Sequence, residues 1–286
     1  MKQIFWGCQG GKALIFMALA FFWGVSGGQG AHAEERVYKI IGQEIKGQGV
    51  DTFEWNQDQL ESLGTEEIPS AYFDKALGYK DSKFRVISFS KLVHRMDPEG
   101  LSDAVLLNCF DDYQGILSVA DIKRYDLQLA TRIHIRSEYQ KPDWLNPLLI
   151  IVPDKKAAPF QERYLTANIR ELRFAKLEDY YSPLLKVAGP PPQTGFSAFK
   201  DNCLFCHSLL GVGGNKGVRL LARYDFSRTD RKERFRKDFS AFHHKDNPDK
   251  QNVEQFVSEN QLEAIIEFLR RVKDLQSDAL PIKESE

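Results

Sequence analysis

Residues 203–207 of the chain read Cys203-Leu204-Phe205-Cys206-His207, two thiols three positions apart followed at once by an imidazole. Within one helical turn, two thiols at this spacing can both add to the vinyl groups of a single haem. The imidazole of the next residue then reaches the iron from the proximal side. The motif therefore predicts one covalently attached c-type haem, with Cys203 and Cys206 as attachment points and His207 as an iron ligand.

Other chemistries also use two nearby cysteines. A redox dithiol of the thioredoxin kind follows a strand and has no need of His207. A zinc site needs four ligands, and the downstream candidates His243 and His244 are adjacent, which is not the spacing of the usual zinc finger. A disulfide between Cys203 and Cys206 is a third alternative. We expect haem, because the flanking sequence is helical and the chain begins with an export signal.

The composition is that of a folded protein. The chain has 286 residues, of which 42% are hydrophobic and 28% charged. This is too apolar for a disordered chain and sufficient for one large domain or two ordinary ones. A formal net charge of -1 argues against a dedicated nucleic-acid binder. Four cysteines are too few for a disulfide scaffold.

The first 33 residues have the features of a signal peptide. Lys2 and Lys12 give a positive start, residues 13–25 form an almost unbroken apolar run, and Ala31-His32-Ala33 has the small-x-small pattern of a cleavage site. A bilayer core needs about 20 apolar residues, so this run is too short to span one. An uncleaved anchor is the alternative. We expect cleavage after Ala33 and a periplasmic protein without a membrane span.

The sequence changes character at Gly189-Pro190-Pro191-Pro192-Gln193. Three prolines favour a stiff, extended spacer, so residues 189–193 are predicted to link a domain over 34–188 to one over 189–286. The first domain is predicted to be α+β. It contains short β-type runs, one of them a continuous apolar run suited to a strand buried on both faces, and one short helix. The predicted strands cover 84–89, 104–107 and 148–152, and the predicted helix covers 120–130.

The second domain is predicted to be helical. Five apolar residues near its end fall on one face of a helix. Ser258, followed three residues later by Gln261, forms a capping box that begins this helix. The apolar face consists of Leu262, Ile265, Ile266, Leu269 and Val272.

Residues from about 190 onward resemble a class I monohaem cytochrome c. The resemblance rests on a glycine and an aromatic residue that precede the first cysteine at four-residue steps. It implies that the glycine lets the first helix cross closely over a helix at 259–273, with Phe268 or Leu269 at the contact. The residues that carry it are Gly195, Phe199, Cys203, Cys206 and His207.

The same resemblance extends to the loop at 211–217, whose glycines are similar to those of the family's loop around the proximal side of the haem. The family usually continues with Gly-Pro, whereas this chain has Gly217-Val218. The resemblance implies that the carbonyl at position 218 holds the second ring nitrogen of His207.

The distal iron ligand departs from the family. Its usual methionine is missing from residues 251–256, and the one methionine of the mature chain, Met96, belongs to the other domain. The candidate ligand is therefore His243 or His244. An empty or water-filled site, or a lysine or Asn252 as the ligand, are the alternatives. Because methionine ligation raises the reduction potential, we expect a potential below that of His/Met cytochromes.

Three segments of the first domain resemble the sulfite-oxidase-like fold, which in many members binds molybdopterin. They are the strand and turn at 105–113, the helix at 120–130, and a pair of closing strands within 146–153 and 163–170. The order and spacing of these segments agree with that family.

A molybdenum centre is not expected in this domain. In the family a cysteine thiolate holds the metal, and Cys109 stands directly before the Asp-Asp-Tyr turn rather than at that position. Residues 104–120 contain no Arg or Lys to anchor the cofactor. We therefore expect a cofactor-free docking module in which Cys109 is a structural thiol and His94 and His134 are structural or surface residues.

Nine basic residues fall between positions 216 and 237. They fit a solvated helical face with internal ion pairs. The functional alternative is a docking surface for an acidic redox partner, or counter-charge for the haem propionates. The nine are Lys216, Arg219, Arg223, Arg228, Arg231, Lys232, Arg234, Arg236 and Lys237.

The sequence thus predicts an α+β protein in which a sulfite-oxidase-like mixed α/β domain precedes an all-α class I cytochrome c domain. Its predicted function is single-electron transfer in the periplasm, with a redox protein or a dehydrogenase as partner and no catalytic residue of its own. Two alternatives stay open. One is a molybdenum-dependent enzyme of the sulfite-dehydrogenase kind with a fused haem, and the other is a haem sensor or peroxidase-like protein with an open sixth site.

Overall fold

The structure is a computed structural model that describes residues 36–42, 51–188, 194–244 and 253–279. Contacts divide the chain into Met1–Glu34 and Glu35–Glu286, and all described residues belong to the second unit. The predicted signal peptide and the predicted linker at 189–193 lie outside the described residues.

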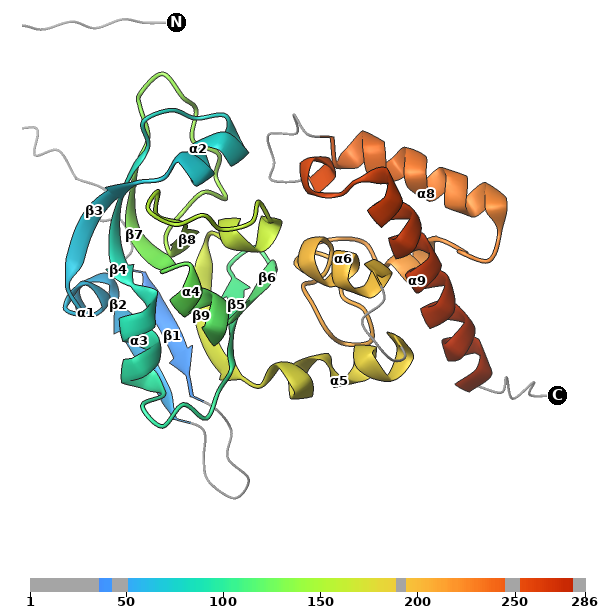
Figure 1. Cartoon of the computed structure of the whole chain (residues 1–286), viewed down its shortest axis with the longest axis horizontal. Coiled ribbons are helices and arrows are strands. Elements are labelled where there is room, and N and C mark those ends of the chain that lie inside the picture. The colour runs from blue at the N-terminus through green and yellow to red at the C-terminus, as the bar shows by residue number, and fades with distance from the viewer. Residues whose placement is uncertain (1–35, 43–50, 189–193, 245–252, 280–286) are drawn as a thin grey trace, which may run out of the picture. The chain divides into compact units, whose positions relative to one another are not determined.

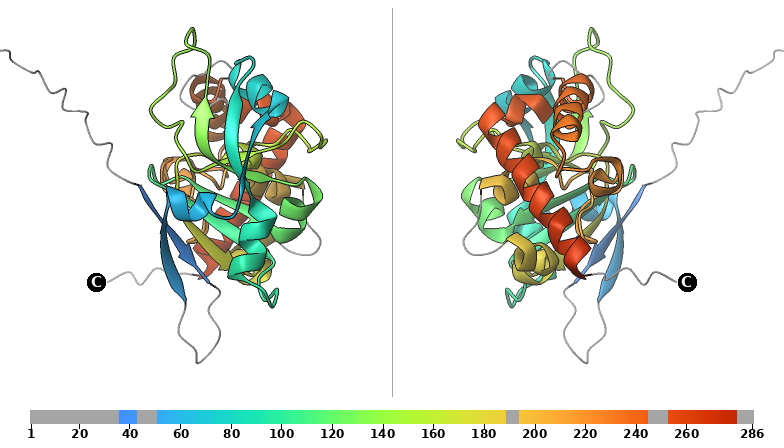
Figure 2. Two further views of the ribbon diagram at one scale, coloured as in Figure 1. Left: turned by 90° about the vertical axis from the view of Figure 1, so that its left-hand side faces the viewer. Right: turned by 90° about the vertical axis from the view of Figure 1, so that its right-hand side faces the viewer.

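A five-stranded sheet has the order β2-β1-β9-β5-β6 (Figure 1). Strands β1 and β2 run antiparallel side by side (Figure 2), β9 pairs parallel with β1, and β5 pairs antiparallel with both β9 and β6. Strand β9 is the central strand of this sheet, and nearly all residues of the neighbouring β5 are buried. The strands are β1 (Val37–Ile41), β2 (Thr52–Asn56), β5 (Ala104–Cys109), β6 (Gln114–Ser118) and β9 (Ile169–Ala175).

A second sheet of four antiparallel strands has the order β3-β4-β7-β8. The strands predicted at 84–89 and 148–152 are confirmed as β4 and β8, and the three residues of β8 are fully buried. The strands are β3 (Thr65–Pro69), β4 (Lys83–Ser88), β7 (Gln128–His134) and β8 (Leu149–Ile151).

Short helices join and cover these strands. Ser70, Ser88 and Ser118 each begin a helix by accepting a hydrogen bond from a backbone N–H of its first turn, as serine N-caps do. The elements are α1 (Gln57–Glu61), α2 (Ala71–Leu77), α3 (Phe89–Met96), α4 (Val119–Arg124) and the 3₁₀ helix η1 (Glu162–Leu165).

The helix predicted over 120–130 is too long. Helix α4 ends at Arg124, and Asp126 takes a left-handed φ of 50° that turns the chain into β7. Leu127, Leu129 and Ala130 are buried as part of the sheet core, not as one face of a helix. Their apolar run fits both periodicities, and the sequence pattern did not separate them.

The described elements that follow β9 are helices joined by loops. The predicted last helix is confirmed as α9, together with its capping box, in which Gln261 N–H donates to Ser258 Oγ at 3.3 Å and Ser258 N–H donates to Gln261 Oε1 at 2.9 Å. The elements are α5 (Leu177–Ala188), α6 (Thr194–Asn202), α7 (Leu220–Arg223), α8 (Thr229–Phe242), the 3₁₀ helix η2 (Val253–Phe256) and α9 (Glu259–Ala279).

The predicted fold class is wrong. The protein is mixed α/β with two sheets, and no distinct all-α cytochrome domain separates from them, because residues 35–286 form one compact unit. Phe205, between the two cysteines, is 2% exposed and belongs to the hydrophobic core of the sheets. Its ring stacks on Tyr113 at 5.5 Å between centroids and 5° between planes. Phe205, within the predicted helical domain, therefore packs against the sheets.

The predicted pair of closing strands is confirmed only in part. The two segments are joined by backbone hydrogen bonds from Ile150 N–H to the Thr166 carbonyl at 2.8 Å and from Ile169 N–H to the Leu148 carbonyl at 3.0 Å. Strand β8 belongs to the four-stranded sheet and β9 to the five-stranded one, so they do not form a ladder together. Residues 163–165 form part of η1 rather than a strand. The strand and turn predicted at 105–113 are confirmed by β5 and the tight connection to β6.

Helix α6 crosses α9 at a glycine, as the sequence predicted. A Cβ atom at position 195 would lie 2.0 Å from the carbonyl oxygen of Ala264 and 3.0 Å from Cβ of Phe268. Only glycine permits this approach without moving one of the two helices.

A Gly195→Ala variant is therefore expected to destabilise the protein by about 1–3 kcal/mol through overpacking, despite the better helix propensity of alanine. Urea unfolding, monitored by far-ultraviolet circular dichroism, measures the change in the free energy of unfolding. Ser197→Ala in the same helix is the matched control and should leave the midpoint almost unchanged. Equal midpoints for the two variants would contradict the close crossing.

Candidate haem-binding site

A cavity of about 270 Å³ carries the cysteine motif in its wall. Helix α7 contributes Leu220, Tyr224 directly follows this helix, and α8 contributes Phe235 and Phe239, so most of the lining is apolar or aromatic. The sheets contribute Tyr113 and Glu162. A mostly apolar cavity with a few convergent polar groups is the usual form of a cofactor site.

The motif forms a turn directly after α6. The backbone N–H of Cys203 donates to the Phe199 carbonyl at 2.8 Å, and that of His207 donates to the Cys203 carbonyl at 2.9 Å. Cys203, Cys206 and His207 consequently all reach the same cavity. Burial raises the pKa of Cys203 to about 12, with a smaller contribution from Cys206. The first thiol of a thioredoxin-type dithiol has a lowered pKa, so this environment disfavours the redox-dithiol alternative.

His207 is fixed by a backbone carbonyl. Its Nδ1 lies 2.8 Å from the Val218 oxygen, the hydrogen bond that the cytochrome resemblance implied. A carbonyl can only accept, so Nδ1 carries the proton and Nε2 presents its lone pair. Burial lowers the pKa of His207, against a smaller opposing effect of the Val218 hydrogen bond. The neutral ring, which is the form that binds metals, is therefore favoured.

The backbone of Gly217 packs closely against the His207 ring. A Cβ atom at position 217 would lie 2.4 Å from Cε1 of His207, and the Gly217 N–H donates to the Cys206 carbonyl at 2.7 Å. The loop can hold the ring only because this position has no side chain.

The structure separates the two candidate distal histidines. His243 follows α8 directly and lines the cavity, whereas His244 is exposed and does not. The His243 and His207 rings have centroids 6.1 Å apart and planes at 81°. Two imidazoles that bind one metal ion from opposite sides have centroids about 6 Å apart, because each metal–nitrogen bond is about 2 Å long. Met96 packs against the sheet core instead, and Asn252 lies outside the described residues.

Residues 111–114, at the connection between β5 and β6, bind the motif and the loop that follows it through hydrogen bonds and an ion pair. Gln114 N–H donates to the Phe205 carbonyl at 2.9 Å, and Asn215 N–H donates to the Asp112 carbonyl at 3.0 Å. Lys216 forms an ion pair with Asp111 at 2.6 Å. Sequence reasoning missed these contacts, because they join positions about 100 residues apart and no local pattern marks them.

Two further residues of the wall were missed. Tyr113 is 3% exposed and Glu162 is 1% exposed. The Tyr113 hydroxyl donates to Glu162 Oε1 at 2.6 Å. In the sequence, Glu162 is one acidic residue among many. Nothing in the local pattern indicates that it is buried in the wall of the cavity.

Cys109, His94 and His134 were also singled out from the sequence, and they do not line the cavity. Cys109 is 1% exposed, and its thiol lies 3.8 Å from the Leu107 carbonyl. His94 and His134 are exposed. Six of the nine basic residues at 216–237 form ion pairs, which fits the solvated face with internal pairing. The six are Lys216, Arg223, Arg228, Arg231, Arg234 and Arg236.

No family model matches the chain, and no curated protein matches it significantly. Among the residues that the structure describes, no helix is both long enough and apolar enough to cross a bilayer. In the same residues, no three side chains of His, Cys, Asp or Glu gather into a metal-binding group. A haem iron differs from such a site, because the porphyrin supplies four of its ligands and the protein supplies only the axial ones.

Proposed function

We propose that the chain carries one haem, bound covalently by Cys203 and Cys206, and that it transfers single electrons between redox partners. The observation that carries this proposal is the arrangement of His207, whose Nδ1 is held by Val218 and whose ring centroid lies 6.1 Å from that of His243 in the wall of the same cavity. The proposal does not depend on a separate cytochrome domain.

The residues around the cavity fit a haem. The two thiols line the same cavity as the imidazole that follows them, and apolar side chains of α7 and α8 supply the lining that a porphyrin requires. When bound, the haem supplies one-electron chemistry. The chain itself provides tethering by the cysteines, and the hydrogen bond from His207 to Val218 raises the basicity of the ligand and fixes its direction.

His243 favours electron transfer over the two alternatives, a molybdenum enzyme and a haem sensor or peroxidase. If His243 and His207 both bind the iron, no axial position is left for a gas or a peroxide, which argues against the sensor and peroxidase alternatives. A molybdenum enzyme would need an accessible thiolate in the sheets. Cys109 is almost fully buried there, which argues against that alternative too.

We propose a location outside the cytoplasm, where c-type haem is attached, and a redox protein or a dehydrogenase as partner. The predicted signal peptide supports this location. The partner is the class of protein that supplies or accepts one electron at a time.

A comparison of two adjacent histidines tests the axial ligation. His243→Ala is expected to convert the haem from six-coordinate low-spin to five-coordinate high-spin, whereas the control His244→Ala should keep the wild-type spectrum. Reduced protein should bind carbon monoxide rapidly only in the His243 variant. A low-spin spectrum in His243→Ala that carbon monoxide does not change would contradict the proposed ligand.

A further inference from the structure

A second pocket, of about 520 Å³, is lined by the loop that follows the cysteine motif, by α7 and by the end of α9. Its lining is mostly polar, unlike that of the cavity that contains the cysteines. Ser208, Asn215 and Gln276 contribute a hydroxyl group and two amides. Arg219 and Lys273 contribute two cations. A pocket of this size can hold a small molecule, and this lining favours a polar one.

Hydrogen bonds fix the walls of this pocket. In the loop, Leu209 and Val212 exchange two backbone hydrogen bonds, of 2.8 and 3.0 Å. Lys273 of α9 donates to the carbonyl group of Leu221 in α7 at 3.1 Å, so the two helices are tied together at the pocket. The walls are therefore in place before any ligand binds, which lowers the entropic cost of binding.

Arg219 gives the pocket a positive charge. It is exposed and, unlike six of the other basic residues at 216–237, forms no ion pair with a residue that the structure describes. None of the described residues that line the pocket is acidic. A cation in a polar pocket without an acid attracts anions and can form charge-assisted hydrogen bonds with them.

Lys273, in contrast, already interacts with an acid. The pKa of Asp225 is lowered first by hydrogen bonds from Ser227, and the charges of Arg228 and Lys273 lower it further. Lys273 therefore adds to the positive potential of the pocket, whereas Arg219 supplies the charge with which an anion can pair.

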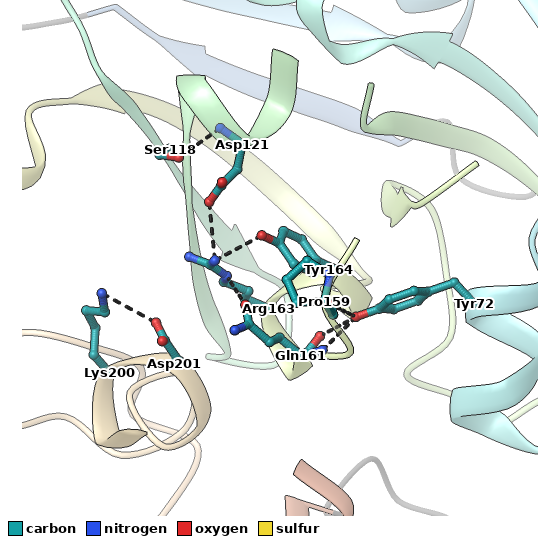
Figure 3. A network of polar contacts seen from close by, with 9 residues as sticks. All are labelled: Tyr72, Ser118, Asp121, Pro159, Gln161, Arg163, Tyr164, Lys200 and Asp201. Carbon is teal, nitrogen blue, oxygen red and sulfur yellow. Dashed lines mark hydrogen bonds and ion pairs between the residues drawn. The ribbon is translucent and has the colours of Figure 1, made fainter. Parts of the chain in front are cut away.

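Two cations elsewhere in the fold have carboxylates of their own (Figure 3). Arg163 forms an ion pair with Asp121 at 3.2 Å. Lys200 forms one with Asp201 at 3.5 Å. An external anion would have to compete with these carboxylates, so neither position favours a ligand. At Arg219 no described residue competes in this way.

We propose that this second pocket binds a small anion that carries carboxylate or phosphate groups. The Arg219 guanidinium can donate two parallel hydrogen bonds to either group, and Lys273 adds a second positive charge. Ser208, Asn215 and Gln276 hydrogen-bond the remaining polar atoms of the ligand. This binding is a further function of the chain and does not depend on the haem proposed above.

The test is isothermal titration calorimetry of the full chain with succinate and, separately, with inorganic phosphate, with sodium chloride keeping the ionic strength constant. At least one of the two anions should bind saturably at one site. Arg219→Gln should weaken this binding about tenfold or more, which is the effect of losing a charge-assisted hydrogen bond. Arg219 precedes α7 without a side-chain cap hydrogen bond, so the variant should fold normally.

Lys237→Gln is the matched control. Lys237 is exposed and lines neither pocket, so the variant removes the same charge from the same basic segment and should keep the wild-type affinity. Lys273→Gln tests the contribution of α9 and should weaken binding severalfold. In amide spectra of isotope-labelled protein, the bound anion should shift the signals of Gly211 and Gly213, which line the pocket.

Binding of succinate alone or of phosphate alone would support the site and identify the anionic group that it prefers. The proposal is overturned if neither anion binds saturably, or if Arg219→Gln binds as tightly as the wild type. An equal loss of affinity in Lys237→Gln would show a response to overall charge and would also overturn it. Amide shifts confined to α8 would place the anion elsewhere, with the same consequence.

Discussion

The double variant Cys203→Ser/Cys206→Ser is expected to carry no covalently bound haem. Serine has nearly the shape of cysteine, so the turn that follows α6 should form as before, but a hydroxyl does not add to a haem vinyl group as a thiol does. Each single variant removes one of the two tethers and should leave one thioether. The measurement is the intact mass of the denatured protein, combined with haem-stained electrophoresis.

Cys109→Ser is the control for these variants. Cys109 is buried in the sheet core and does not line the cavity, so its substitution can affect stability but should leave the haem attached. Covalent haem in the double variant, or its loss in Cys109→Ser alone, would show that the attachment site is not the one proposed.

Phe205→Ala is expected to destabilise the whole unit of residues 35–286, by about 3–5 kcal/mol, which is the usual cost of removing a buried phenylalanine. The ring is 2% exposed and stacks on Tyr113, so its removal leaves a cavity in the core of the sheets although the residue stands between the two cysteines of the motif. Phe53→Ala is the matched control, since Phe53 lies on β2 and is 40% exposed.

Two probes can follow this unfolding separately. Trp55 and Trp144, the two tryptophans that follow the predicted signal peptide, lie before α5 and report through fluorescence, whereas the absorbance of the proposed haem would report on the motif. We expect both transitions in urea to coincide, and to shift together in Phe205→Ala. A shift of the haem transition alone, with an unchanged tryptophan transition, would indicate that the chain unfolds as two independent domains.

Local features of the site could be predicted from the sequence. The spacing of Cys203, Cys206 and His207 is fixed within one turn, and the capping box of α9 lies within four residues. The resemblance to cytochromes c added the close crossing at Gly195 and the carbonyl at position 218, both of which the structure has. These features depend on residue types at short, fixed separations, and the sequence records such separations directly.

The misread features depend on contacts between distant segments. The helix predicted over 120–130 ends early, because the chain turns at Asp126 and joins a sheet formed by residues far away. Phe205 stacks on Tyr113 across about 90 residues, and no local pattern in the sequence marks this contact. Apolar patterning shows that a side chain is buried, but not what it is buried against.

The preference for His243 over His244 likewise needed the structure. Both residues stand after the same predicted helical stretch, and no periodicity separates them. The end of α8 at Phe242 directs the first toward the cavity and leaves the second exposed.

The most direct test of covalent haem attachment is the mass of the peptide that contains residues 203–207. The protein is expressed with haem-attachment proteins and extracted with acid and organic solvent before the peptide is prepared. We expect this peptide to carry the added mass of one haem and to keep its colour after extraction. A colourless peptide with two unmodified cysteines would contradict it.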